Sequence, residues 1–240
     1  MKKTAIALIA ASALSAPLMA AAAENDSNEW TGNGELGLAV SKGNTDSETF
    51  VGKFNMLQET PQWKNAFGAS LLYGKDDDEE NARRYELYGT TGYRLSDRSY
   101  TFGSLRNERD HFTSYEYQWT AAAGYGYEAI KTDDTHLTFE IGPGYRWSKL
   151  QDVQVHRNGA IGRGYMDFAT KLTTTTSLID TFLVEAGSDN TFLSNVFGLH
   201  VQMSDQLALK AGLETRYNSD VLPGIKKTDN LTTINVVYGF

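Results

Sequence analysis

Alternation between apolar and polar residues runs along nearly the whole chain after its first segment, and it is the strongest constraint on the fold. In residues 115–129, 137–148 and 207–218 every second side chain is apolar and the intervening ones are polar, charged or glycine, with Ala122, Ala208 and Thr215 as the exceptions. A period of two places successive side chains on opposite faces of a β-strand. The pattern predicts an all-β chain of about twelve strands, at residues 30–41, 47–59, 63–75, 82–96, 99–111, 114–130, 136–149, 157–172, 176–187, 190–203, 207–218 and 229–240.

The first segment has a different character. Lys2 and Lys3 precede a short apolar run, and the small residues Ala20 to Ala23 follow it. This order of positive, apolar and small residues is typical of a secretory signal peptide. We therefore expect a signal peptide over 1–23, with cleavage after Ala22 or Ala23, and a β-barrel domain over 24–240.

Composition excludes several classes of function. After residue 23 there is no stretch of 18 consecutive apolar residues, so membrane-spanning helices are not expected. The chain has 22 basic and 30 acidic residues, and loss of Lys2 and Lys3 leaves 20 against 30, a net charge of −10. An acidic chain without basic clusters is a poor binder of nucleic acid.

Strand length and the connections favour a transmembrane antiparallel up-and-down barrel. Tilted membrane strands need about 9–11 residues, and the expected strands reach that length. Alternate connections are short, such as those at 60–62 and 132–134, whereas the others are longer or charged, such as 219–228. Outer-membrane barrels have short periplasmic turns and longer outer loops, and an even strand count would put both termini on the periplasmic side. A soluble β-sandwich or lipocalin-like barrel remains the alternative, because alternation alone does not distinguish inside from outside.

The chain ends on an alternating apolar series that includes Tyr238 and Phe240. This ending resembles the C-terminal signature of bacterial outer-membrane proteins. The resemblance implies an assembly signal at Tyr238 and Phe240, recognised by the barrel-assembly machinery. It also implies a location in the bacterial outer membrane after export through the inner membrane, with outer-membrane lipid and lipopolysaccharide as partners.

A second resemblance concerns the first hairpin. The segment GELGLAVSKGNTDSETF, residues 34–50, contains an opening strand followed by the turn Gly43-Asn44-Thr45. Together with the barrel pattern it resembles the family of salt-induced outer-membrane proteins, whose domain is of unknown function. The similarity covers the whole mature chain down to Phe240, and it implies a fold and a location but no catalytic residues or cofactor.

Residue types give little support for an enzyme or a metal site. His111, His136, His156 and His200 lack a neighbouring serine in the pattern that a barrel hydrolase would need. The acidic run at 76–80 lacks the spacing of a calcium loop, and a solvated loop is the default reading, with weak Ca²⁺ or Mg²⁺ binding as a hypothesis. We therefore predict no catalytic residue, no metal site and no cofactor.

The polar face of the strands predicts the character of the lumen. By alternation the side chains expected to line it carry seven acidic and eight basic groups. They are Glu35, Lys53, Arg84, Glu86, Arg94, Glu116, Glu128, Glu140, Arg146, Arg163, Asp167, Lys171, Lys210, Glu214 and Arg216. Alternation is ambiguous in the strands at 99–111 and 176–187.

This mixture of charges leaves two functions open. Charges that line water would make a small, weakly selective or gated channel for small solutes or ions. Charges that pair across the lumen would make a closed structural barrel that contributes to envelope integrity under salt or acid stress. Twelve strands lie between the filled barrels of eight and the open ones of sixteen, and therefore allow both.

Overall fold

The computed structural model describes residues 29–42, 47–76, 79–111, 113–151 and 155–240. The expected signal peptide, 1–23, lies outside these residues, as do the turn at 43–45 and part of the acidic run. Within the described part, no helix is long and apolar enough to cross a membrane.

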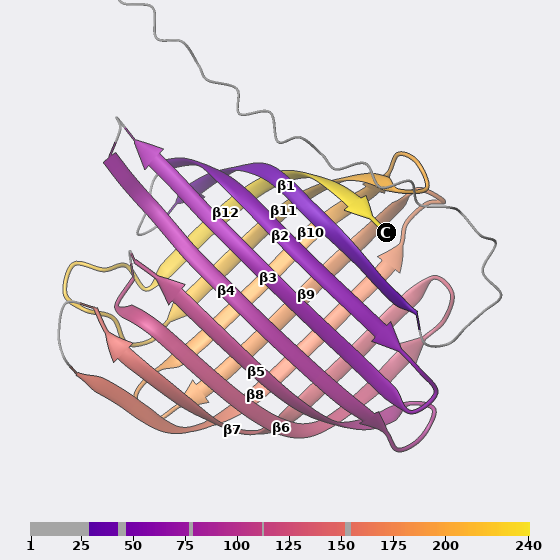
Figure 1. Cartoon of the computed structure of the whole chain (residues 1–240), viewed down its shortest axis with the longest axis horizontal. Coiled ribbons are helices and arrows are strands. Elements are labelled where there is room, and N and C mark those ends of the chain that lie inside the picture. Colours follow the sequence, from indigo (N-terminus) through magenta and orange to yellow (C-terminus); the bar gives the residue numbers. More distant parts are fainter. Residues whose placement is uncertain (1–28, 43–46, 77–78, 112, 152–154) are drawn as a thin grey trace, which may run out of the picture.

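The described residues form twelve antiparallel strands that close into one barrel (Figure 1). The strands are β1 (Trp30–Lys42), β2 (Ser47–Glu59), β3 (Trp63–Asp76), β4 (Glu79–Arg94), β5 (Ser99–Asp110), β6 (Tyr115–Lys131), β7 (Thr135–Leu150), β8 (His156–Lys171), β9 (Thr176–Gly187), β10 (Thr191–Gln202), β11 (Leu207–Asn218) and β12 (Thr228–Gly239). Each strand pairs with the next along the chain, and β1 pairs with β12. The predicted all-β, up-and-down barrel of twelve strands is confirmed.

The seam between β1 and β12 depends on the last residue. Phe240 exchanges two backbone hydrogen bonds with Gly32, at N–O distances of 2.8 and 2.9 Å. Its ring lies over Gly32, where an added Cβ would come within 2.7 Å of the ring, and its centroid is 6.0 Å from that of Phe54. Glycine at position 32 therefore makes room for the ring that covers the seam.

The two faces of the barrel are inverted relative to those of a soluble protein. Apolar side chains such as Leu38, Ile141 and Ile234 are 75, 71 and 67 % exposed on the outside. The interior holds buried charged and amide side chains, among them Arg146 and Glu185, besides a small apolar cluster that includes Val51. A soluble sandwich or lipocalin-like barrel would bury its apolar face. The observed arrangement suits a barrel surrounded by lipid.

Aromatic side chains form exposed groups near both ends of the barrel. At one end the rings of Trp63 and Tyr93 meet edge to face, with centroids 5.2 Å apart. Near the other end, Trp119 is opposite Trp147, whose ring lies 4.8 Å from that of Tyr145. Aromatic girdles at two levels are typical of barrels that cross a bilayer.

The five connections at 60–62, 95–98, 132–134, 172–175 and 203–206 lie at one end of the barrel, which we call the turn end. In each of them a Ser or Thr hydroxyl accepts a hydrogen bond from the backbone N–H three residues later, at 2.8–3.2 Å. These hydroxyls are those of Thr60, Ser96, Thr132, Thr173 and Ser204. Such hydroxyl-capped turns explain why these connections are tight. We call the opposite end, which carries the connection 219–227, the loop end.

Two local expectations are wrong. Pro143 lacks a backbone N–H and predicts a bulge, but β7 keeps its register with β6 and β8 around it. Gly124 and Gly142 approach so closely there that an added Cβ on either would lie 2.1 Å from a backbone oxygen. The bulges of β6 occur elsewhere, at Tyr115/Tyr117 and Glu128/Ile130. The acidic run is also shorter as a loop than expected, since β3 and β4 extend into it.

Candidate functional site

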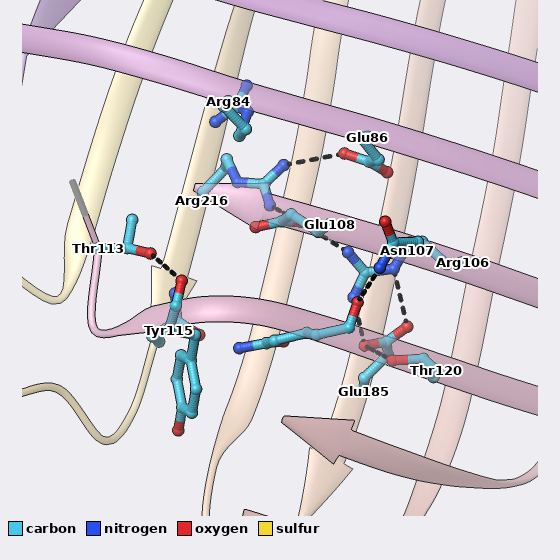
Figure 2. A network of polar contacts seen from close by, with 12 residues as sticks. Arg84, Glu86, Arg106, Asn107, Glu108, Thr113, Tyr115, Thr120, Glu185 and Arg216 are labelled. Atoms are coloured by element: carbon cyan, nitrogen blue, oxygen red, sulfur yellow. Dashed lines mark hydrogen bonds and ion pairs between the residues drawn. The ribbon is translucent and has the colours of Figure 1, made fainter. Parts of the chain in front are cut away.

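A layer of interlocked charges crosses the lumen in the half of the barrel nearer the loop end (Figure 2). We call it the charge layer. Its members come from five strands and are Arg84, Glu86, Arg106, Glu108, Arg146, Glu185, Glu214 and Arg216.

One side of the charge layer is centred on Glu185. Arg106 binds this carboxylate through two nitrogens, at 2.6 and 3.2 Å, and binds Glu108 at 2.7 Å. Arg146 lies 3.2 Å from the same carboxylate and donates to the carbonyl oxygens of Glu185 and Asn190 at 3.0 and 2.9 Å. Both Arg146 and Glu185 have side chains only 2 % exposed. Hydrogen bonds on this scale compensate the cost of removing these charges from water.

The other side of the charge layer reaches the opposite wall. Arg216 of β11 forms an ion pair with Glu108 of β5 and lies 3.4 Å from Glu214. Arg84 binds the same Glu214 at 2.6 Å. The ring of Phe192, from the loop-end part of β10, packs against the layer, with its centroid 4.8 Å from the guanidinium carbons of both Arg106 and Arg216. Charged groups and this ring therefore fill the lumen at this level.

Further pairs connect the charge layer to the seam. Lys210 binds Glu35 at 2.9 Å, and the Asn235 amide donates to the same carboxylate at 3.0 Å. Lys53 lies 3.4 Å from Glu214. Because β1 and β12 supply Glu35 and Asn235, the polar network extends across the closure of the barrel.

A cavity of about 720 Å³ extends from the charge layer toward the turn end. Arg106 and Glu185 line it at the charge layer, and Glu59 and Lys64 line it near the turn end. Its walls combine charged side chains with tyrosine rings and small residues. The cavity is large enough for several water molecules or one small solute.

The aromatic wall of this cavity includes Tyr100 and Tyr165. The Tyr100 hydroxyl donates to Glu140 at 2.8 Å, and Arg163 binds the other oxygen of Glu140 at 2.7 Å. The Arg163 guanidinium lies over two rings, with centroids of Phe102 and Tyr165 at 4.9 and 5.2 Å. This guanidinium is therefore held by stacking as well as by its ion pair.

The connection 219–227 is fastened across the loop end, and we call it the strap. The Leu222 N–H donates to the hydroxyl of Ser114, in the connection between β5 and β6, at 2.8 Å. Asp220 forms an ion pair with Arg157, and its N–H donates to Asn190 at 3.1 Å. The strap thus starts from β11 and is attached to the wall opposite it.

Ten of the fifteen residues expected in the lumen line the cavity. They are Glu35, Lys53, Arg84, Glu86, Glu140, Arg163, Asp167, Lys210, Glu214 and Arg216. The structure places the other five elsewhere. Arg146 lies inside the charge layer, and Arg94 and Glu128 form a 3.4 Å ion pair at the turn end. Lys171 lies at the turn end, 3.4 Å from Asp134.

Glu116 is on the wrong face in the sequence-based assignment. The bulge at Tyr115/Tyr117 shifts the alternation, so that Tyr115 and Gln118 are the buried residues of this segment. Glu116 instead forms an ion pair with Lys149, which follows the outward Trp147 by two residues. A single bulge reverses the face of every residue beyond it.

The sequence assignment also missed charged residues that the structure brings into the lumen. Arg106, Glu108 and Glu185 belong to strands with polar residues on both faces, so alternation gave no direction. Glu59 and Lys64 lie on either side of a turn, and the assignment of lumen-facing side chains considered only the interior of each strand. The pairing of β5 with β6, whose alternation is clear in its middle, is the signal that could have oriented β5.

Comparison with known proteins places this fold among outer-membrane barrels. The chain is similar to the NanC porin, with a TM-score of 0.58 and 12 % identity, covering 85 % of this chain and 98 % of that one. It is also similar to the translocator domain of the autotransporter NalP from Neisseria meningitidis, with a TM-score of 0.52, 13 % identity and 88 % of both chains covered. An outer-membrane channel from Pseudomonas putida F1 gives a TM-score of 0.51 at 10 % identity, over 91 % of this chain and 99 % of that one. At these identities the likeness concerns the fold.

Sequence comparison finds a relative with higher identity than these structures have. The chain is 25 % identical over 215 residues to the uncharacterized protein YdiY of Escherichia coli K12, covering 87 % of this chain and 82 % of that protein. The family model of proteins of unknown function, DUF481, matches residues 34–240. The resemblance read from the first hairpin and the barrel pattern is confirmed, and the chain belongs to the DUF481 family.

Proposed function

We propose that this protein is a gated channel for small polar solutes or ions in the bacterial outer membrane. The observation that carries the proposal is the cavity of about 720 Å³ inside a closed twelve-stranded wall, lined by charged and hydroxyl-bearing side chains. A polar interior within an apolar exterior is the arrangement by which membrane barrels offer a water path. The folds of the NanC porin and the Pseudomonas putida channel support this class of function.

The location and orientation belong to the same proposal. The exposed apolar side chains and the two aromatic groups suit a bilayer, and residues 1–23 would direct export through the inner membrane and then be removed. The turn end would face the periplasm and the strap would face the outside, beside lipopolysaccharide. Tyr238 and Phe240 would serve as the signal for the barrel-assembly machinery.

The gate would consist of the charge layer and the strap. Ion pairs within the charge layer join strands on opposite walls, and their side chains are at most 20 % exposed. The strap is fastened to Ser114 above this layer. Opening would exchange ion pairs across the lumen for pairs along each wall, with water entering between them.

A closed structural barrel is the second candidate, and the completeness of the charge layer favours it. Buried ion pairs that satisfy one another can fix the shape of a lumen without any need to open. Such a barrel would support the envelope under salt or acid stress and conduct nothing.

Single-channel recording separates these two functions. Protein purified from membranes is inserted into a planar bilayer at 0.1 and 1 M salt (about these concentrations, chosen to change screening). Discrete conductance steps that grow with salt support the channel. A protein that is shown to be folded by its β-sheet circular dichroism, and that gives no steps at either concentration, contradicts the channel and supports the structural barrel.

A further inference from the structure

The cavity lies between the charge layer and the turn end. Equal numbers of acidic and basic side chains line it, but not all of the acidic ones are paired with a basic one. All seven of the lysine and arginine side chains that line it lie within 3.5 Å of a carboxylate oxygen. These cationic side chains are only 9–21 % exposed. The cations of the wall are therefore neutralised and largely covered.

Asp167 is the exception among the lining carboxylates. In the described part of the chain its ion-pair neighbour is His136, with Nε2 at 3.7 Å from Oδ2, and no lysine or arginine nitrogen lies within 4.0 Å. The same His136 nitrogen is 2.8 Å from the Thr138 hydroxyl, which competes for it. The Asp167 side chain is 40 % exposed, although it points into the barrel with Tyr165 and Arg163 of the same strand face. A carboxylate thus faces the cavity with part of its hydrogen-bonding capacity unused.

A flat aromatic surface lies across the cavity from this strand. The Tyr88 ring lies against Gly68, where an added Cβ would be 2.2 Å from the ring. Its hydroxyl donates to Asn55 at 2.9 Å, which fixes the ring along the wall. Tyr88 and Asp167 both line the cavity. One ring face is therefore covered by the wall, and the other is turned to the cavity.

The neighbouring ring shows how such a surface is used within this protein. Tyr100 also lies over a glycine, Gly126, and its free face holds the Lys64 ammonium 5.6 Å from the ring centroid. No cation of the described residues lies over the face of Tyr88. The cavity thus contains one occupied ring and one ring of the same construction without a cation.

We propose that the cavity binds small organic ammonium ions, with Asp167 accepting N⁺–H hydrogen bonds and Tyr88 covering the apolar part of the ligand. A charge-assisted hydrogen bond to a carboxylate is strong in a partly dehydrated site, and the ring face attracts a cation. This proposal rests on the proposed channel and names the solute class of its cavity. A metal ion is a poorer fit, because in the described residues no three His, Asp or Glu side chains are grouped to hold one.

Binding can be measured without conduction. The protein purified from membranes is titrated calorimetrically in detergent with benzylammonium, and with benzyl alcohol and benzoate as neutral and anionic analogues of the same shape. Benzylammonium is expected to bind at least about tenfold more tightly than either analogue. Affinity for the ammonium ion should fall as salt is raised.

Three variants locate the site. Asp167→Asn keeps the size of the side chain and should remove the preference for benzylammonium over benzyl alcohol. Tyr88→Leu should weaken benzylammonium binding by about threefold to tenfold. Asp180→Asn is the matched control, because Asp180 alternates with the lumen residues Ile179 and Thr181 and so faces outward, where it pairs with Asn195 at 2.6 Å. It removes the same charge and should leave binding unchanged.

Equal affinity for the ammonium ion and the alcohol, or an Asp180→Asn effect as large as that of Asp167→Asn, would overturn the site. A protein that conducts but binds benzylammonium no more tightly than its analogues would overturn the site and support the channel. Ammonium binding that depends on Asp167 in a barrel without conductance would support the site and overturn the channel.

Discussion

Glu108 of β5 and Arg216 of β11 form an ion pair between two strands that lie six positions apart in either direction around the barrel. In a ring of twelve strands these positions are diametrically opposite. One glutamate and one arginine side chain together therefore span the lumen at this level.

Replacing Arg216 should open this level. Arg216→Gln leaves Glu86, Glu108 and Glu214 without their shared cation. Water and small cations should enter, so that single-channel conductance rises and the reversal potential under a salt gradient shifts toward cation selectivity. Arg98→Gln, which removes the same charge from the exposed turn end, should change neither quantity. Wild-type conductance and selectivity in Arg216→Gln would show that the charge layer does not limit flow.

The strap can be locked covalently, because the chain has no cysteine. The Leu222 nitrogen and the Ser114 hydroxyl oxygen are 2.8 Å apart, so the two residues are in direct contact, and Ser114→Cys with Leu222→Cys is the pair to cross-link. We expect the oxidised double variant to show fewer or smaller conductance steps than the wild type, with recovery after reduction. Each single variant serves as a control and should not respond to the reductant. Equal recordings from the oxidised and reduced double variant would exclude the strap as part of the gate.

Loss of Arg146 should destabilise the barrel strongly. Arg146→Leu removes one of the two cations of Glu185 and the side-chain donor to the carbonyl oxygens of Glu185 and Asn190. Breaking a buried pair on one side costs about 3–5 kcal/mol in free energy of unfolding. Guanidinium unfolding in lipid vesicles, followed by tryptophan fluorescence, measures this change. The double variant Arg146→Leu, Glu185→Leu should cost less than the sum of the single variants, because the two residues interact directly; additive costs would contradict the pairing.

The glycine at the seam should tolerate a side chain better when the ring above it is absent. Gly32→Ala places a Cβ within 2.7 Å of the Phe240 ring and should destabilise the barrel by roughly 1–3 kcal/mol. In a Phe240→Ala background the same substitution should cost less, because the remaining close contact is the Asn55 carbonyl oxygen at 3.0 Å. Unfolding in lipid vesicles measures both. An equal cost in the two backgrounds would mean that the ring does not occupy this space.

The fold was predictable from the sequence because its strongest signal is local. A membrane barrel needs one lipid-facing and one lumen-facing series in every strand, and the predicted strands 47–59, 176–187 and 207–218 coincide with β2, β9 and β11. The short connections expected at 60–62 and 132–134 are also found between strands in the structure. Strand length and the difference between short and long connections indicated which face points to lipid, and both are indirect evidence.

The lumen was less predictable because its contacts depend on properties that alternation does not carry. The bulge that turns Glu116 outward leaves no mark in a pattern of Tyr and Glu residues. Arg106 and Glu185 lie in strands whose outer faces also hold polar residues, such as Asn107 and Asp180, so neither face could be assigned. The pairing of acidic with basic side chains also depends on the stagger between strands around the barrel, its shear. The charges in a sequence do not specify this stagger.

The polar network that links the seam to the opposite wall has a consequence for the order of events during folding. Its partners are distant along the chain: Glu35 and Asn235 are 200 residues apart, Lys210 and Glu35 175, and Arg84 and Glu214 130. An open sheet, in which β1 has not met β12, brings none of these groups together, so its charges remain hydrated. Dehydration of the lumen and closure of the sheet must then occur in one cooperative step late in folding. Unfolding in the bilayer should accordingly be all-or-none, with no stable intermediate that has kept half of its ion pairs.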